Sequence, residues 1–314
     1  MASYLTRRLF LAVAVLLVAL LLLFLLIYAV PGDPATIALG PRATEAQKAV
    51  FRHQMGLDQP LFTQALRFLL LLAEGDFGTD IISQRPVAQL VFSALPLTVL
   101  LAVVGLGWAA LLGIPLGIWA ALRRNSWVDR LIGVLSTSVV ALPAFLTAIY
   151  GLILFSVTLR WFPAIGAGEP GDLGDQIYHL ILPAFAVGVA WVGYIARLVR
   201  VAMLETLAEN HVRTYRTFGL SDLRIALCFA LPIAVVPVIS VLGVGMGNLL
   251  SGAVLVEIVF SRPGLGSLAY QAVISRNFPV LLGSVVVTTA LYVAANFLAD
   301  LFVALLDPRV AEKG

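Results

Sequence analysis

Long apolar runs alternate with short charged segments along most of this chain. The runs cover residues 9–30, 94–122, 131–159, 180–201, 232–256 and 280–305. Because a helix rises about 1.5 Å per residue, roughly 20 residues cross the ~30 Å hydrocarbon layer of a bilayer. Each run is long enough for this, so the pattern predicts an all-α integral membrane protein with six transmembrane helices.

The first run predicts a retained membrane helix rather than a signal peptide. It is roughly 22 residues long, which exceeds the apolar region of a signal peptide. No small-x-small cleavage site occurs at Tyr28-Ala-Val-Pro31, where the run ends. Residues 1–30 are therefore expected to be a short tail and the first transmembrane helix.

A long polar loop, residues 31–93, separates the first run from the second. It contains an amphipathic stretch at residues 60–73 and a helix breaker at Gly75-Asp-Phe-Gly78, so short helices are expected in an extracytoplasmic loop. Residues 94–305 are expected to form a five-helix core that includes a polar segment at residues 203–231. Residues 306–314 are expected to be a cytoplasmic tail.

Composition and charge agree with this topology. Apolar residues make up 61% of the chain and charged residues 12%, which excludes a water-soluble single domain. The lone cysteine, Cys228, excludes an internal disulfide. The positive-inside rule places both termini and the polar segment in the cytoplasm, although Arg160, Arg262 and Arg276 lie in short loops on the other side. The basic residues of the cytoplasmic side are Arg7, Arg8, Arg123, Arg124, Arg130, Arg197, Arg200, Arg213, Arg216, Arg224, Arg309 and Lys313.

The polar segment has the chemistry of a site that touches a soluble partner. Val212, Tyr215 and Phe218 recur at helical spacing, and Gly219 is expected to end a short helix. The alternative is an ordinary connector that lies on the membrane surface. The candidate contact residues are Glu209, Asn210, Arg213, Thr214, Tyr215, Arg216, Phe218, Gly219 and Leu220.

The chain lacks the groups that would supply energy for transport or carry out catalysis. The centres of the second to sixth runs hold no ionisable residue, whereas a proton-coupled carrier needs one near the bilayer midplane. The lysines, Lys48 and Lys313, are in no P-loop, and the three histidines form no metal motif. We therefore expect no catalytic, cofactor-binding or metal-binding residue in this chain, and an energy source on another subunit.

Small and polar residues inside the apolar runs suggest close helix packing and a possible pathway. Gly113 and Gly117, like Gly243 and Gly247, are four residues apart, which lets helices approach closely. Prolines such as Pro143 permit kinks. Asn248 and Ser251 either face a water-filled path or bond to a neighbouring helix, and together with Glu257 they are the candidate pathway or gate residues.

Several short motifs together resemble the permease subunits of ATP-driven (ABC) importers of the dipeptide, oligopeptide and nickel family. The resemblance covers nearly the whole chain. The motifs are Tyr4-Leu-Thr-Arg-Arg8, Pro31-Gly-Asp-Pro-Ala35, Met55-Gly-Leu-Asp-Gln-Pro-Leu61, Gly75-Asp-Phe-Gly78, Gly113-Ile-Pro-Leu-Gly117, Leu250-Ser-Gly-Ala-Val-Leu-Val-Glu257, Phe260-Ser-Arg-Pro-Gly-Leu-Gly266, Arg276-Asn-Phe-Pro279 and Asp307-Pro-Arg309.

The resemblance implies a type I ABC importer permease fold whose cytoplasmic coupling helix docks on an ATPase subunit. Arg213, Thr214, Arg216 and Gly219 match the core of that segment, whereas Tyr215, Thr217 and Phe218 depart from the usual residues. The implied partners are a second permease, two ATPase subunits that bind ATP and Mg, an extracytoplasmic binding protein and the lipid bilayer of a bacterial inner membrane. No nucleic acid is implied.

The resemblance also limits the substrate class without choosing within it. Related permeases carry dipeptides, oligopeptides, nickel chelates and glutathione, and a di- or oligopeptide is the main expectation. Two alternative functions from other classes of membrane protein stay open. A channel or membrane scaffold would work without any ATPase, and a proton-driven carrier would lose uptake when the proton gradient collapses.

Overall fold

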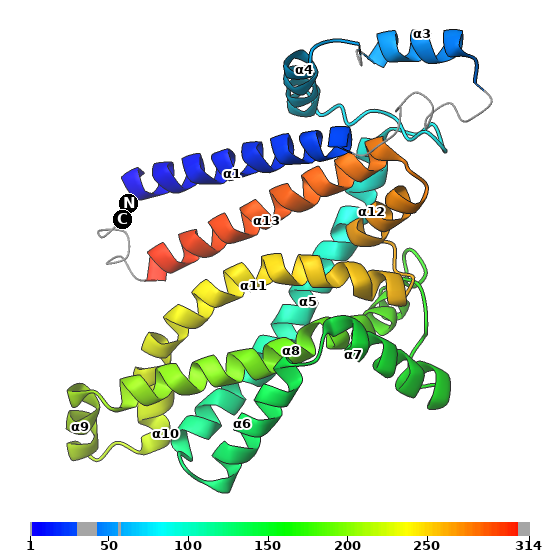
Figure 1. The fold of residues 1–314 in the computed structure, drawn as a ribbon. Coiled ribbons are helices and arrows are strands. Elements are labelled where there is room, and N and C mark those ends of the chain that lie inside the picture. The colour runs from blue at the N-terminus through cyan, green and yellow to red at the C-terminus, as the bar shows by residue number, and fades with distance from the viewer. Residues whose placement is uncertain (1, 30–42, 56–57, 307–314) are drawn as a thin grey trace.

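The computed structural model describes residues 2–29, 43–55 and 58–306. This part of the chain is built from helices, with one isolated bridge between Thr79 and Pro86 as its only β-type pairing. Figure 1 shows the long helices side by side in one layered bundle, with α3 and α4 outside it. The helices are α1 (Ala2–Ala29), α3 (Glu45–Met55), α4 (Leu61–Ala73), α5 (Val87–Leu122), α6 (Trp127–Val140), α7 (Ala144–Gly151), η1 (Leu152–Thr158), α8 (Leu173–Leu207), α9 (Asn210–Thr217), α10 (Asp222–Ile225), η2 (Ala226–Ala230), α11 (Leu231–Val259), α12 (Leu265–Ile274) and α13 (Phe278–Leu306).

Five described helices are long and apolar enough to cross a membrane, and the pair formed by α6 and α7 with η1 supplies a sixth candidate span. The expectation of one continuous third helix over residues 131–159 is wrong, because this pair bends by 96° at residues 141–143. Pro143 caps the start of α7 with an extended backbone, φ −61° and ψ 140°. A proline ring disfavours helical geometry in the residue before it, so the helix ends there.

The second span begins earlier than the apolar run suggested. The helix α5 starts at Val87 rather than at residue 94, and its first turns are polar at Gln89 and Ser93. Tertiary packing explains the extension, because Val87 and Val91 are buried against residues of α12 and α13. The predicted helix at residues 60–73 is confirmed as α4.

A buried carboxylate holds the turn before α5 against the start of α13. Asp80 is buried and accepts hydrogen bonds from Ser83 and from the side-chain amide of Asn277. Burial raises the pKa of Asp80, but the hydrogen bonds from Ser83, Ile82 and Asn277 outweigh it and leave the pKa below its usual value. The carboxylate is therefore ionised at neutral pH and joins segments that are far apart in the sequence.

Glycines bring three helices into backbone contact, as the sequence predicted for Gly113 and Gly117. A Cβ atom on Gly117 would lie 2.6 Å from the carbonyl oxygen of Ala196 on α8. Elsewhere on α8, a Cβ atom on Gly193 would lie 2.5 Å from the carbonyl oxygen of Ser136 on α6. The helices α5, α6 and α8 thus pack as one tight group.

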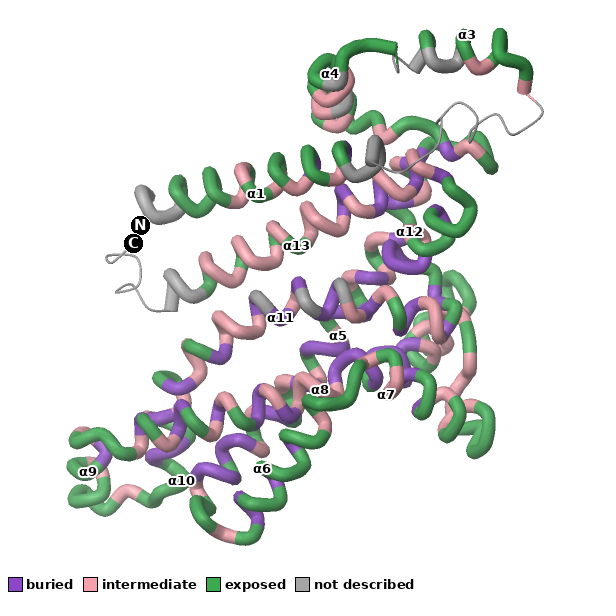
Figure 2. The backbone as a smooth tube through the Cα atoms, in the orientation of Figure 1, coloured by how far each residue is buried: buried purple, intermediate pink, exposed green. Residues whose placement is uncertain are grey.

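The second glycine cluster joins α11 to its neighbours. A Cβ atom on Gly243 would meet Ala299 of α13, and one on Gly245 would meet Trp191 of α8. Figure 2 shows buried residues concentrated along α5, α8 and the second half of α11, whereas α1 is mostly exposed. An ion pair of 2.9 Å between Arg8 and Asp300 joins α1 to the last turns of α13.

Some sequence expectations fall on residues outside the described part of the chain. The Pro31-Gly-Asp-Pro-Ala35 and Asp307-Pro-Arg309 motifs and the tail beyond Leu306 belong to this group. The short helix α12, in contrast, lies in a loop for which the sequence predicted no helix.

Candidate functional site

The polar segment forms a helical turn that projects from the end of α8. The helix α8 continues to Leu207, so Arg197 and Arg200 lie within it. After Glu209 the chain forms α9, then α10, and returns through η2 into α11. Figure 1 shows α9 and α10 on the side where α1 begins and α13 ends.

Gly219 ends α9 as predicted, and the bonding pattern explains why glycine is needed. The Gly219 amide donates to the Arg216 carbonyl at 3.0 Å, and the Leu220 amide donates to the Tyr215 carbonyl at 3.3 Å. This pair of bonds is the Schellman motif, in which the residue after the cap is left-handed. Gly219 has φ +76°, a conformation that strains any residue with a Cβ atom.

One side of α9 faces the protein. Val212 is fully buried, and the Tyr215 ring packs on the Phe229 ring of η2 with centroids 4.3 Å apart. His211 meets Tyr215 edge-on at 5.8 Å. Tyr215 is therefore half-buried and helps to hold α9 in place.

The other side of α9 is open to solvent. Arg213 and Thr214 are exposed, and Phe218 is 75% exposed although it follows the same helical spacing as Val212 and Tyr215. The expectation that these three residues share one apolar side thus applies to Val212 and Tyr215, whereas Phe218 at the end of the helix turns outward. A large apolar ring in water beside cationic side chains is typical of a contact surface.

An ion pair and a histidine–carboxylate contact surround this surface. Arg216 Nε lies 3.0 Å from Asp222 Oδ1 and joins α9 to α10. Glu209 Oε2 lies 3.0 Å from His211 Nδ1 at the start of α9. Asn210 is exposed and Leu220 half-buried at the two ends of the helix. The structure therefore brings all nine predicted contact residues together, and their role in contacting a partner stays a prediction.

Sequence reasoning missed an ion pair that supports this segment from within the bundle. Both oxygens of Asp129, at the start of α6, accept from Arg200 on α8, and the Nη2 contact is 2.8 Å. Asp129 is 6% exposed and also accepts from the Asn125 amide at 2.9 Å. The turn between α5 and α6 is thereby fixed to α8, the helix that leads into α9. No local pattern pairs these two residues, because they are 71 positions apart in the sequence.

The predicted pathway residues are less well tested by the structure. Asn248 and Ser251 lie in α11, and their side chains are outside the described set. Glu257 is 1% exposed and accepts from the Thr98 hydroxyl at 2.6 Å and from the Ser267 amide at 2.9 Å. It therefore joins α5, α11 and α12, and its role in a pathway or gate stays a prediction.

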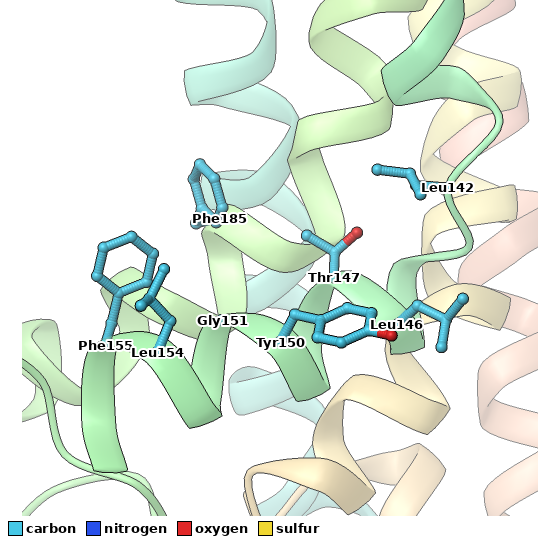
Figure 3. Close-up of a pocket in the computed structure, with 8 residues that line it drawn as sticks. All are labelled: Leu142, Leu146, Thr147, Tyr150, Gly151, Leu154, Phe155 and Phe185. Atoms are coloured by element: carbon cyan, nitrogen blue, oxygen red, sulfur yellow. The ribbon is translucent and has the colours of Figure 1, made fainter. Parts of the chain in front are cut away.

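A pocket of about 210 Å³ lies where α7 and η1 cross α8 (Figure 3). Thr147 and Tyr150 carry its only side-chain hydroxyls, and no lining residue is charged. Such a lining offers no group to bind the charged ends of a peptide. The lining residues are Leu142, Leu146, Thr147, Tyr150, Gly151, Leu154, Phe155 and Phe185.

Comparison with known families identifies the family of the chain. The family described as "Binding-protein-dependent transport system inner membrane component" matches residues 113–312, and its N-terminal companion family matches residues 1–102. This chain belongs to that family of importer permeases. It is thus a multi-pass inner-membrane protein and the permease component of an ABC transporter.

Individual permeases resemble the chain over nearly its full length. It is 36% identical over 313 residues to the glutathione transport system permease protein GsiC of Salmonella paratyphi A, which covers 100% of both chains. It is 38% identical over 315 residues to the probable D,D-dipeptide transport system permease protein DdpB of Escherichia coli K12, with 93% of this chain and 92% of DdpB covered.

The fold also matches a solved permease. A chain of the inward-facing MetNI methionine ABC transporter superposes with a TM-score of 0.60 at 18% identity, which covers 70% of this chain and 97% of that one. The expected type I importer permease fold is thereby confirmed.

Proposed function

We propose that this permease forms half of the translocation pathway of an ATP-driven importer for a di- or oligopeptide. The observation that carries the proposal is its full-length similarity to a dipeptide permease and to glutathione permeases. Glutathione is itself a small peptide, so the GsiC relatives favour it as the second candidate substrate. A nickel chelate has no comparable support among these relatives.

The proposed assembly contains a second homologous permease, two ATPase subunits with ATP and Mg, and an extracytoplasmic binding protein. Both termini and α9 lie in the cytoplasm, as the distribution of arginine predicts. ATP binding closes the ATPases, and α9 passes that motion through α8 to the bundle, so the pathway opens outward. Hydrolysis by the ATPases then returns the pathway to the inward-facing state.

Association with ATPase subunits through α9 is the first testable consequence. We expect the ATPases encoded beside this permease to copurify with it. We expect Arg213→Glu to release them, because this change replaces a positive charge on the exposed contact surface by a negative one. Arg130→Glu is the matched control, since Arg130 is exposed on α6 and outside α9. Pull-down from mild detergent followed by immunoblotting measures retention. Absence of ATPases from the wild-type preparation would favour a channel or scaffold.

Tyr215 in α9 and Phe218 at its C-terminal cap are expected to have different roles. We propose that Phe218 enters the partner groove and contributes to the choice of ATPase, whereas Tyr215 holds α9 through its contact with Phe229. Phe218→Ala should weaken ATPase binding by about 30-fold or more, the size of an interface hot spot, with no loss of thermal stability. Tyr215→Ala should lower the melting temperature of the isolated permease. Equal binding of ATPases from a related importer would count against the specificity role.

A transport assay tests the substrate class. Proteoliposomes that contain the whole importer and its binding protein should accumulate labelled dipeptide or glutathione only with ATP inside. Uptake that persists without ATP, or that stops when the proton gradient is collapsed at constant ATP, would contradict the importer mechanism.

A further inference from the structure

The helix α4 carries an apolar stripe that no described helix covers. Phe62, Leu66 and Leu70 are four residues apart, so they lie on one face of the helix. They are 80%, 50% and 56% exposed, respectively. The polar residues Thr63 and Arg67 are exposed along one edge of this stripe.

The packed cores of the protein leave α4 out. Among the residues whose side chains the structure describes, none of α4 belongs to the three clusters of buried residues, and Figures 1 and 2 show the helix outside the bundle. Its inner side is only half-buried at Ala65, Leu69 and Leu72. Exposure of such a stripe to water is unfavourable, because removal of each large apolar side chain from water lowers the free energy by about 1.5–3 kcal/mol.

The chain after α4 keeps it near the membrane. The Val87 amide, at the first residue of α5, donates to the Gly78 carbonyl at 3.0 Å. Only four residues lie between Ala73, the end of α4, and Gly78, and these five residue-to-residue steps reach at most about 18 Å. Because α5 is a candidate membrane span, α4 cannot move far from the bilayer surface where α5 begins.

We propose that α4 lies in the interfacial layer on the extracytoplasmic face of the inner membrane, with Phe62, Leu66 and Leu70 among the lipid acyl chains. Arg67, at the edge of the stripe, then lies level with the lipid phosphates. A helix of 13 residues is about 20 Å long, too short to cross the hydrocarbon layer but long enough to lie in the interface.

Lipid fits this stripe better than a protein that docks and leaves. A transient partner would leave three large apolar side chains in water between encounters, whereas acyl chains are present throughout the cycle. The membrane-bound helix would also hold the long outer loop in one position beside the bundle.

Site-directed spin labelling of the assembled importer in liposomes tests this placement. Cys228 is the only cysteine, so Cys228→Ser provides the background for Leu66→Cys in the stripe and for Thr63→Cys at its polar edge as the matched control. We expect the label at residue 66 to show a several-fold higher ratio of oxygen to nickel-chelate collisions than the label at residue 63. Phe62→Cys provides a second stripe position if Leu66→Cys does not assemble.

Three outcomes would overturn the proposal. Equally high access of the nickel chelate to the labels at residues 66 and 63 would place the stripe in water. Loss of access to both reagents only after the binding protein is added would make the stripe a docking surface for that protein. Loss of access to both reagents without the binding protein would show a contact with another protein chain of the importer.

Discussion

Replacing Gly117 by leucine is expected to force α5 away from α8 and to lower the stability of the folded permease. Even a Cβ atom at this position would lie 2.6 Å from the Ala196 carbonyl oxygen and 2.7 Å from the Val199 Cβ atom. The backbone carbonyl cannot rotate away as a long side chain could. Overpacking of this kind costs about 1–3 kcal/mol, and a whole leucine should reach the upper part of that range or exceed it.

Gly107 provides the matched control for this substitution. It lies on the same helix and is exposed, and a Cβ atom there would meet nothing within 4 Å. Gly107→Leu should therefore leave the melting temperature of the purified permease nearly unchanged, whereas Gly117→Leu should lower both that temperature and the yield of folded protein. Equal effects of the two substitutions would show that the close α5–α8 contact does not limit stability.

The apolar runs predicted the membrane helices because a bilayer imposes one dominant constraint on sequence. A long uncharged run must satisfy its own backbone groups as a helix, whatever its neighbours are. Glycine spacing likewise predicted a close helix approach at Gly117, because small residues at helical spacing are a local signal, but the structure alone shows that the partner is α8. Gly219 was predictable for the same reason, since a left-handed turn at a helix end needs glycine.

Features that depend on distant residues could not be predicted from local patterns. The 96° bend between α6 and α7 needed more than Pro143, because Pro96 lies inside α5 without ending that helix. The early start of α5 depends on the burial of Val87 against α12 and α13. The exposure of Phe218 also depends on how α9 packs against η2, which helical spacing alone does not predict.

Glu257 shows most clearly how long-range contacts change the interpretation of a residue. As a polar group near the end of an apolar run, it was a candidate for a pathway or gate. Its carboxylate oxygens accept from Thr98 on α5 and from the Ser267 amide in the first turn of α12, and the pathway role stays a prediction. The Thr98 hydroxyl in turn accepts from the Leu265 amide at 2.8 Å. Distant side chains thus satisfy amides at the start of α12 that no helical carbonyl can reach.

The neighbouring Arg262 makes the charge of Glu257 important. Arg262 is 1% exposed, and its Nε and Nη1 atoms have no hydrogen-bond partner among the described residues. The Arg262 amide donates to the Glu257 carbonyl at 2.8 Å, which keeps the two residues close. The Glu257 carboxyl group and the Arg262 guanidinium also attract each other electrostatically, so the carboxylate compensates part of the buried positive charge.

Neutralising Glu257 is expected to destabilise the region where α5, α11 and α12 meet. Glu257→Gln keeps the size of the side chain but removes its negative charge. It also replaces one of the two oxygens that accept from the Thr98 hydroxyl and the Ser267 amide by an NH₂ group, which can only donate. A buried polar group left without its hydrogen bond costs about 1–3 kcal/mol, and the weaker compensation of Arg262 adds to that cost, so the melting temperature of the permease in detergent should fall clearly. The double variant Glu257→Gln with Arg262→Met should recover much of the loss, because it removes the uncompensated charge as well. If Glu257→Gln instead kept the wild-type melting temperature and changed only substrate uptake, Glu257 would belong to the pathway, and the polar contacts around it would be secondary to that role.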